Sequence, residues 1–214
     1  MIDIYCERTG PAFWAEPINA LTNLCFLLAA LILYVQARQN RGLSKDTGLL
    51  IALIVAIGIG SALFHTYATR TAMLADVLPI FFFQLAFLVI FSRQVIGLSH
   101  VMTFRLFMVY VLLTILSGYV PRDWLNGSLS YLPAFLFLLG FGIYHAGFAR
   151  EKSRLLLIAS GIFLLSLTFR SVDLLLCSRF EIGTHFLWHV LNAVVLYLCT
   201  FVIIRQTQPS HRAS

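Results

Sequence analysis

Seven apolar segments, each close to 20 residues long, constrain the fold of this 214-residue chain more than any other feature. A helix needs about 20 mostly apolar residues to cross a bilayer, and polar or turn residues separate each segment from the next. The predicted spans are 18–37, 48–67, 72–92, 102–120, 128–148, 154–174 and 184–204. We therefore predict an all-α integral membrane protein, with residues 1–214 forming one seven-helix domain.

The composition excludes most other classes of protein. Apolar residues make up 60% of the chain and charged residues only 11%, whereas a soluble domain has about 45–50% and about 25%. A disordered chain and a soluble enzyme are both incompatible with these values. A transmembrane β-barrel is disfavoured because its strands alternate apolar and polar residues, and the apolar runs here are continuous.

Basic residues predict how the chain is oriented in its membrane, because they collect in cytoplasmic loops. Ten fall on the side that we assign to the cytoplasm: Arg38, Arg41, Lys45, Arg93, Arg105, Arg150, Lys152, Arg154, Arg205 and Arg212. Four fall on the other side: Arg8, Arg70, Arg122 and Arg179. The N-terminus is therefore expected outside or in the lumen and the C-terminus in the cytoplasm. This distribution explains the net charge of +6 without a nucleic-acid partner.

Five polar residues within the predicted spans are the candidates for function, since polar groups are costly in a bilayer and mark functional sites. Ser61 and His65 are four residues apart on one helix face, as are His185 and His189, and Asp76 is the carboxylate of the third span. At about 1.5 Å of rise per residue, all five fall within one slab about 10 Å thick near the exterior side. Helices two, three and seven need only face one another for these groups to meet.

Three histidines at one depth predict a zinc site, because three imidazoles and a water form a common catalytic zinc centre. Zinc lowers the pKa of a bound water to about 7, Asp76 is placed to act as the general base, and Ser61 to donate to an oxyanion. Blander interpretations remain open: a histidine can hydrogen-bond between helices, Asp76 can merely orient a ligand, and Ser61 can be a small residue at a helix contact.

Two further pairs have a structural interpretation. Arg170 and Asp173 are three residues apart and predict an ion pair on one helix face. Cys6 and Cys177 both fall on the exterior, oxidising side. The residues alone leave open whether these two cysteines form a disulfide or remain free thiols.

Three blocks of sequence resemble the alkaline ceramidase family, within the superfamily of seven-helix intramembrane metal hydrolases that includes adiponectin receptors. The first contains Cys6-Glu7, then FWAEPIN at 13–19 and Thr22-Asn23. The second is GIGSALFH at 58–65 followed by DVLP at 76–79, and the third is Asp173, Cys177 and HFLWH at 185–189. The blocks occur in the family's order, and the short loops resemble those of bacterial members.

The resemblance implies a ligand set, a reaction and two further features. It implies His65, His185 and His189 as zinc ligands, roles for Ser61 and Asp76 at the zinc-bound water, and a bridge between Cys6 and Cys177. Some family members also bind calcium through an acidic N-terminal segment, for which the candidate ligands here are Asp3, Glu7 and Glu16. Arg8 and Thr9 stand where the family often has further acidic or amide ligands.

The predicted function is a zinc-dependent amidase that cleaves ceramide, or another N-acyl lipid, into a fatty acid and an amine such as a sphingoid base. One alternative is a receptor-like seven-helix protein that keeps zinc for structure. Another is a transporter or proton channel in which histidine and aspartate form a relay. The expected location is a bacterial inner membrane or, in a eukaryote, the endoplasmic reticulum or Golgi. The oligomeric state is not given by the sequence.

Overall fold

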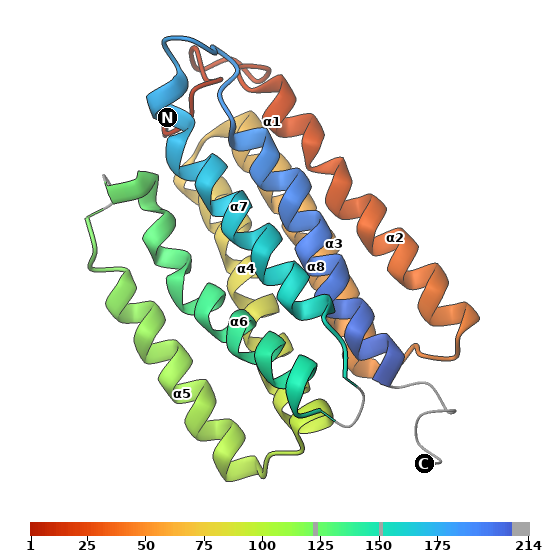
Figure 1. The fold of residues 1–214 in the computed structure, drawn as a ribbon. Coiled ribbons are helices and arrows are strands. Elements are labelled where there is room, and N and C mark those ends of the chain that lie inside the picture. The colour runs from red at the N-terminus through yellow and green to blue at the C-terminus, as the bar shows by residue number, and fades with distance from the viewer. Residues whose placement is uncertain (122–123, 150–151, 207–214) are drawn as a thin grey trace.

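The computed structural model describes residues 1–121, 124–149 and 152–206, and within them the only regular structure is helical. The elements are α1 (Pro17–Thr22), α2 (Leu24–Gln39), α3 (Lys45–Tyr67), α4 (Arg70–Phe91), the π-helix η1 (Ser92–Ile96), α5 (His100–Ser117), the 3-10 helix η2 (Trp124–Tyr131), α6 (Leu132–Gly147), α7 (Leu155–Leu176) and α8 (His185–Gln206). Figure 1 shows them as one bundle, with α2 and α5 at opposite edges.

Seven of the helical stretches in the described part of the chain are long and apolar enough to span a membrane, which confirms the predicted fold class. α1 and α2 together form the first span, Pro17–Gln39, and η1 extends the third span to Ile96. The fifth span begins at Trp124, four residues before the predicted start. Its beginning is irregular because Leu125, Asn126 and Gly127 have positive φ angles.

α8 is the central helix of the bundle and α5 is the most peripheral. Over half of the apolar window of α8 is buried inside the protein, against 11% of that of α5. α8 packs along α7 and also contacts α1, α2, α3 and α4. A side chain on the inner face of α8 can therefore meet residues from several other helices.

The N-terminal segment, residues 1–16, folds over the end of the bundle at which α3 ends and α8 begins. The backbone N–H of Ile2 donates to the carbonyl of Ala68, directly after α3. The ring of Tyr5 packs against Phe64 and against His185 at the start of α8. This end of the bundle is opposite the one that we assign to the cytoplasm, and it contains the polar residues singled out above.

Candidate metal centre

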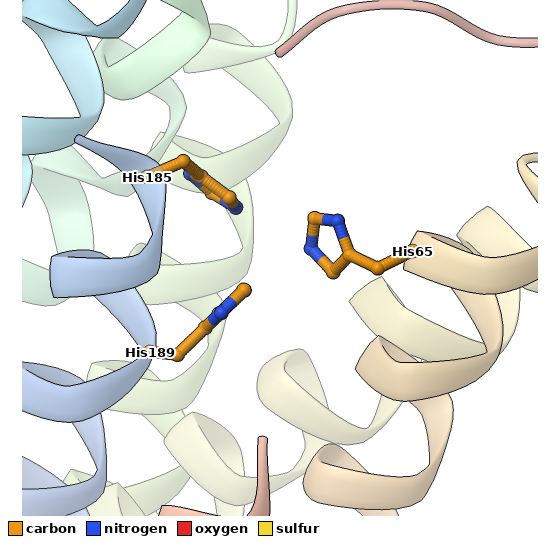
Figure 2. Close-up of side chains that lie close together, drawn as sticks. All are labelled: His65, His185 and His189. Atoms are coloured by element: carbon orange, nitrogen blue, oxygen red, sulfur yellow. The ribbon is translucent and has the colours of Figure 1, made fainter. Parts of the chain in front are cut away.

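Three histidine rings converge beneath the N-terminal segment. His65 lies in the last turn of α3, and His185 and His189 lie in the first two turns of α8. Their nitrogen ligand atoms are within 4.8 Å of one another, and all three side chains are buried. In Figure 2 the rings of His185 and His189 point toward the ring of His65 across the gap between the two helices.

Hydrogen bonds on the outer side of two rings set which nitrogen carries the proton. Nδ1 of His65 lies 2.5 Å from the carboxylate of Glu16, which accepts its hydrogen. Nδ1 of His189 lies 2.9 Å from the hydroxyl of Thr22. That hydroxyl donates to the carbonyl of Ile18, so it accepts from the imidazole. Both rings therefore keep the lone pair on Nε2.

Each of the three rings also has a buried nitrogen without a hydrogen-bond partner among the described residues: Nε2 of His65, Nδ1 of His185 and Nε2 of His189. A buried polar atom without a partner costs about 1–3 kcal/mol. A metal ion bound between the rings would supply a partner for several of these nitrogen atoms at once. Three neutral imidazoles fit the donor set of a catalytic zinc site, which leaves a fourth position open.

Ser61 and Asp76 lie beside this cluster. Ser61 is one turn before His65 on α3, and its hydroxyl is within hydrogen-bonding reach of the Asp76 carboxylate on α4. Asp76 is also close enough to His65 to interact electrostatically. Gly60 makes this approach possible, because a Cβ atom there would overlap the backbone carbonyl of Ala75.

Glu16 accepts hydrogen bonds on both of its carboxylate oxygens. One of its carboxylate oxygens accepts from the guanidinium of Arg8 and the other from His65. Arg8 also donates to the carbonyls of Gly10, at 3.1 Å, and His65, at 2.8 Å. Burial by itself would raise the pKa of Glu16, but the bond from His65 and the charge of Arg8 lower it below its ordinary value. Glu16 is therefore a stable anion behind the His65 ring.

The chain matches the family model described as Ceramidase over residues 5–213, nearly its whole length. It belongs to the ceramidase family. A comparison with curated proteins gives no match. Family membership implies hydrolase activity, a lipid substrate and a position in the membrane, in agreement with the seven apolar helices.

The carboxylates expected to bind calcium do not form a cluster in this ceramidase-family chain. Among the residues that the structure describes, the three histidines are the one group of three or more potential ligands whose ligand atoms all lie within 4.8 Å of one another. Asp3 is exposed, and the two oxygens of Glu7 accept the backbone N–H groups of Ile18 and Asn19 at the start of α1. Burial raises the pKa of Glu7. The calcium site therefore stays a prediction of the family resemblance alone, and these contacts together with the Arg8–Glu16 pair lead us to expect no calcium binding.

Cys6 and Cys177 form a disulfide, with a Cα–Cα distance of 5.3 Å, which ties the N-terminal segment to the end of α7. Asp173, one turn before Cys177, accepts the backbone N–H of Cys6 at 2.9 Å. It also accepts those of Thr184 at 2.6 Å and His185 at 2.9 Å. The same carboxylate thus caps the start of α8 at His185 and also fixes the N-terminal segment, which covers this end of the helix.

The expected ion pair between Arg170 and Asp173 is wrong. The spacing permits it, but backbone amides occupy the carboxylate of Asp173. The guanidinium of Arg170 faces the rings of Tyr5, Tyr131 and Trp188 instead. Sequence reasoning also missed Tyr5, whose ring stacks on His185 with centroids 3.5 Å apart. The adjacent Cys6 was the one available signal that residue 5 is held at the site.

An apolar cavity lies in the bundle close to the histidines, lined by residues from α2 to α8 that include Ile57, Phe83, Tyr110, Phe141, Phe163 and Trp188. Its volume is about 80 Å³, several times the roughly 10–15 Å³ that one water needs. Trp188 follows His185 by three residues on α8, so the cavity begins beside the metal centre. An apolar chain fits such a lining better than water does.

Proposed function

We propose that this chain is a zinc-dependent intramembrane hydrolase that cleaves the amide bond of ceramide, or of a related N-acyl lipid, into a fatty acid and an amine. The observation that carries the proposal is the convergence of His65, His185 and His189 next to Asp76. Membership of the ceramidase family supports the substrate class.

The three histidines are the proposed zinc ligands. When bound there, zinc supplies a Lewis acid for the amide carbonyl and lowers the pKa of a water to about 7. Glu16 and Thr22 hold the His65 and His189 rings in the tautomer that directs Nε2 to the ion. Asp173 fixes the first turn of α8 and with it His185.

Asp76 is the proposed general base, since it is the carboxylate beside the cluster that no cation neutralises by direct contact within the described chain. It takes the proton of the attacking water and passes it to the nitrogen of the leaving amine. Ser61 orients the Asp76 carboxylate and is placed to donate to the oxygen of the carbonyl as negative charge develops there.

The apolar cavity beside Trp188 is the proposed site for a hydrocarbon chain of the substrate. A lipid can enter such a cavity laterally from the bilayer, so the site needs no wide opening to water. The depth of the histidines fits this arrangement, since an amide linkage lies near the polar surface of a membrane while its acyl chain lies deeper.

The test is Asp76→Asn, measured for zinc content and for release of fatty acid from ceramide and from other N-acyl lipids. We expect one zinc per chain, as in the wild type, and a loss of turnover of at least about 100-fold. Asp46→Asn, at the opposite end of α3, is the matched control and should retain activity.

Full activity of Asp76→Asn would end the general-base proposal. Bound zinc without hydrolysis of any amide lipid in the wild type would favour the receptor-like alternative. Ion flux in liposomes without bound zinc would favour the transporter or proton channel.

A further inference from the structure

Arg170 is a charged residue within a membrane-spanning helix, and its surroundings are aromatic. On α7, its guanidinium carbon lies 6.0 Å from the ring centroid of Tyr5, 5.5 Å from that of Tyr131 and 5.6 Å from that of Trp188. A cation on aromatic faces gains about 0.5–2 kcal/mol per favourable contact. Such contacts leave the edge of the guanidinium, where the N–H groups point, available for hydrogen bonds.

Within the described part of the chain, the hydrogen-bond partners of that edge are all neutral, and they do not use every N–H group of the guanidinium. Nη1 donates to the carbonyl of Asn126 and to the hydroxyl of Ser128, and Nη2 reaches the hydroxyl of Tyr5 at a long 3.5 Å. Nε makes no hydrogen bond to the described residues. Nε and Nη2 present two parallel N–H groups, the arrangement that binds a carboxylate through both oxygens.

The positive charge of Arg170 also lacks a paired anion in the described chain. The carboxylate of Asp173 already accepts hydrogen bonds from three backbone N–H groups. Asp76 is near enough for an electrostatic interaction but not for an ion pair. Charges within a membrane segment are costly and as a rule are paired. An anionic ligand bound here would balance the positive charge of the Arg170 guanidinium.

Arg170 lies close to His185 of the metal centre and to one wall of the apolar cavity. On one side the Tyr5 ring separates it from His185, on which that ring stacks. On the other side Tyr131 and Trp188, which flank the guanidinium, are part of the cavity lining. The anionic head of a molecule bound at Arg170 would therefore lie next to the wall of the cavity that Tyr131 and Trp188 form.

We propose that Arg170 anchors the carboxylate of a long-chain fatty acid whose hydrocarbon chain enters the bundle through the apolar cavity. The proposal rests on the proposed function, because amide hydrolysis produces a fatty acid of this kind beside the cavity. Arg170 is then a product-binding residue, and free fatty acid inhibits the enzyme by occupying the place of the substrate's acyl chain.

The test compares palmitate with hexadecanol, which has the same chain length and a neutral head group. Each is titrated as a competitor of a fluorescent fatty acid bound to the purified protein in detergent, at a pH at which palmitate is ionised. We expect the wild type to bind palmitate about tenfold or more tightly than hexadecanol. Arg170→Gln should lose this preference and bind hexadecanol as the wild type does.

Two further variants separate anchoring from folding. Arg170→Lys keeps the charge and the aromatic contacts but not the paired N–H groups, so we expect it to retain only part of the preference. Arg179→Gln, an exposed arginine just beyond α7, is the matched control and should bind both ligands as the wild type does. Equal binding of palmitate and hexadecanol by the wild type, or an unchanged preference in Arg170→Gln, would overturn the anchor.

The outcome is separable from that of the proposed function. A protein that hydrolyses ceramide but binds the two ligands equally contradicts the anchor and leaves the hydrolase intact. A protein that prefers palmitate through Arg170 but cleaves no amide lipid supports the anchor as a fatty-acid site and contradicts the hydrolase.

Discussion

Glu16 accepts a hydrogen bond from Nδ1 of His65 at 2.5 Å, and Arg8 holds the other oxygen of the same carboxylate. The N-terminal segment therefore does more than cover the site, because it fixes the ring of a proposed metal ligand from behind. Such outer partners raise the basicity of a ligand and hold its orientation.

Replacing Glu16 by Gln should weaken zinc binding about 10- to 100-fold, the usual effect of losing an outer carboxylate partner. The affinity is measured by competition with a chromophoric chelator. Glu181→Gln, in the exposed loop before α8, is the control and should bind zinc as the wild type does. An unchanged affinity of Glu16→Gln would show that the His65 contact has no role in metal binding.

Gly60→Ala should lower both stability and activity, because the added methyl group would overlap the carbonyl of Ala75 and push α4 away from α3. Asp76, the next residue on α4, would move with it. Gly48→Ala is the matched control on the same helix, where a Cβ atom meets nothing within 4 Å. It should be neutral or slightly stabilising. Thermal unfolding and amide hydrolysis are the two measurements, and equal behaviour of the two variants would contradict the close approach of the helices.

Removal of the disulfide by Cys6→Ser should destabilise the fold by about 2–5 kcal/mol, the usual range for a native bridge. It should also loosen Tyr5 over His185, since residue 5 is adjacent to the bridge. Melting temperature with and without reductant measures the effect. Cys25→Ser, which removes a free thiol, should respond to reductant as the wild type does. A wild type whose melting temperature is unaffected by full reduction would count against a structural role.

Calcium should have no effect on this protein. The guanidinium of Arg8 already contacts the Glu16 carboxylate and two carbonyl oxygens, the kind of ligand that calcium prefers. The measurement is the melting temperature in millimolar calcium and in a calcium chelator that spares zinc. A clear rise with calcium would restore the site that the family resemblance implies.

The fold and the common depth of the histidines were both predictable from the sequence, for related reasons. A bilayer dictates the length of each span, and the rise of a helix converts position into depth, so His65, His185 and His189 were expected at one level. Depth does not fix which helix faces which. Their meeting in the structure depends on the central position of α8.

The contacts that the N-terminal segment makes to the histidines could not be predicted in this way, because this segment has no periodic pattern of apolar residues. Tyr5, Arg8 and Glu16 precede the first span, and their positions follow from the disulfide and from carboxylates that accept backbone amides. The error at Arg170 has a similar origin. Spacing along one helix shows that two side chains can meet, but not that better partners from other segments take both of them.

The most direct test of the account is the zinc content of the purified protein, measured by elemental mass spectrometry on the wild type and on a His185→Ala/His189→Ala variant. Preparation without chelators is essential, and ceramide hydrolysis is measured on the same samples. We expect close to one zinc per chain in the wild type, and loss of both zinc and hydrolysis in the variant. A wild type that hydrolyses ceramide without bound metal, or that keeps its zinc after both histidines are removed, would contradict the assignment of the metal centre.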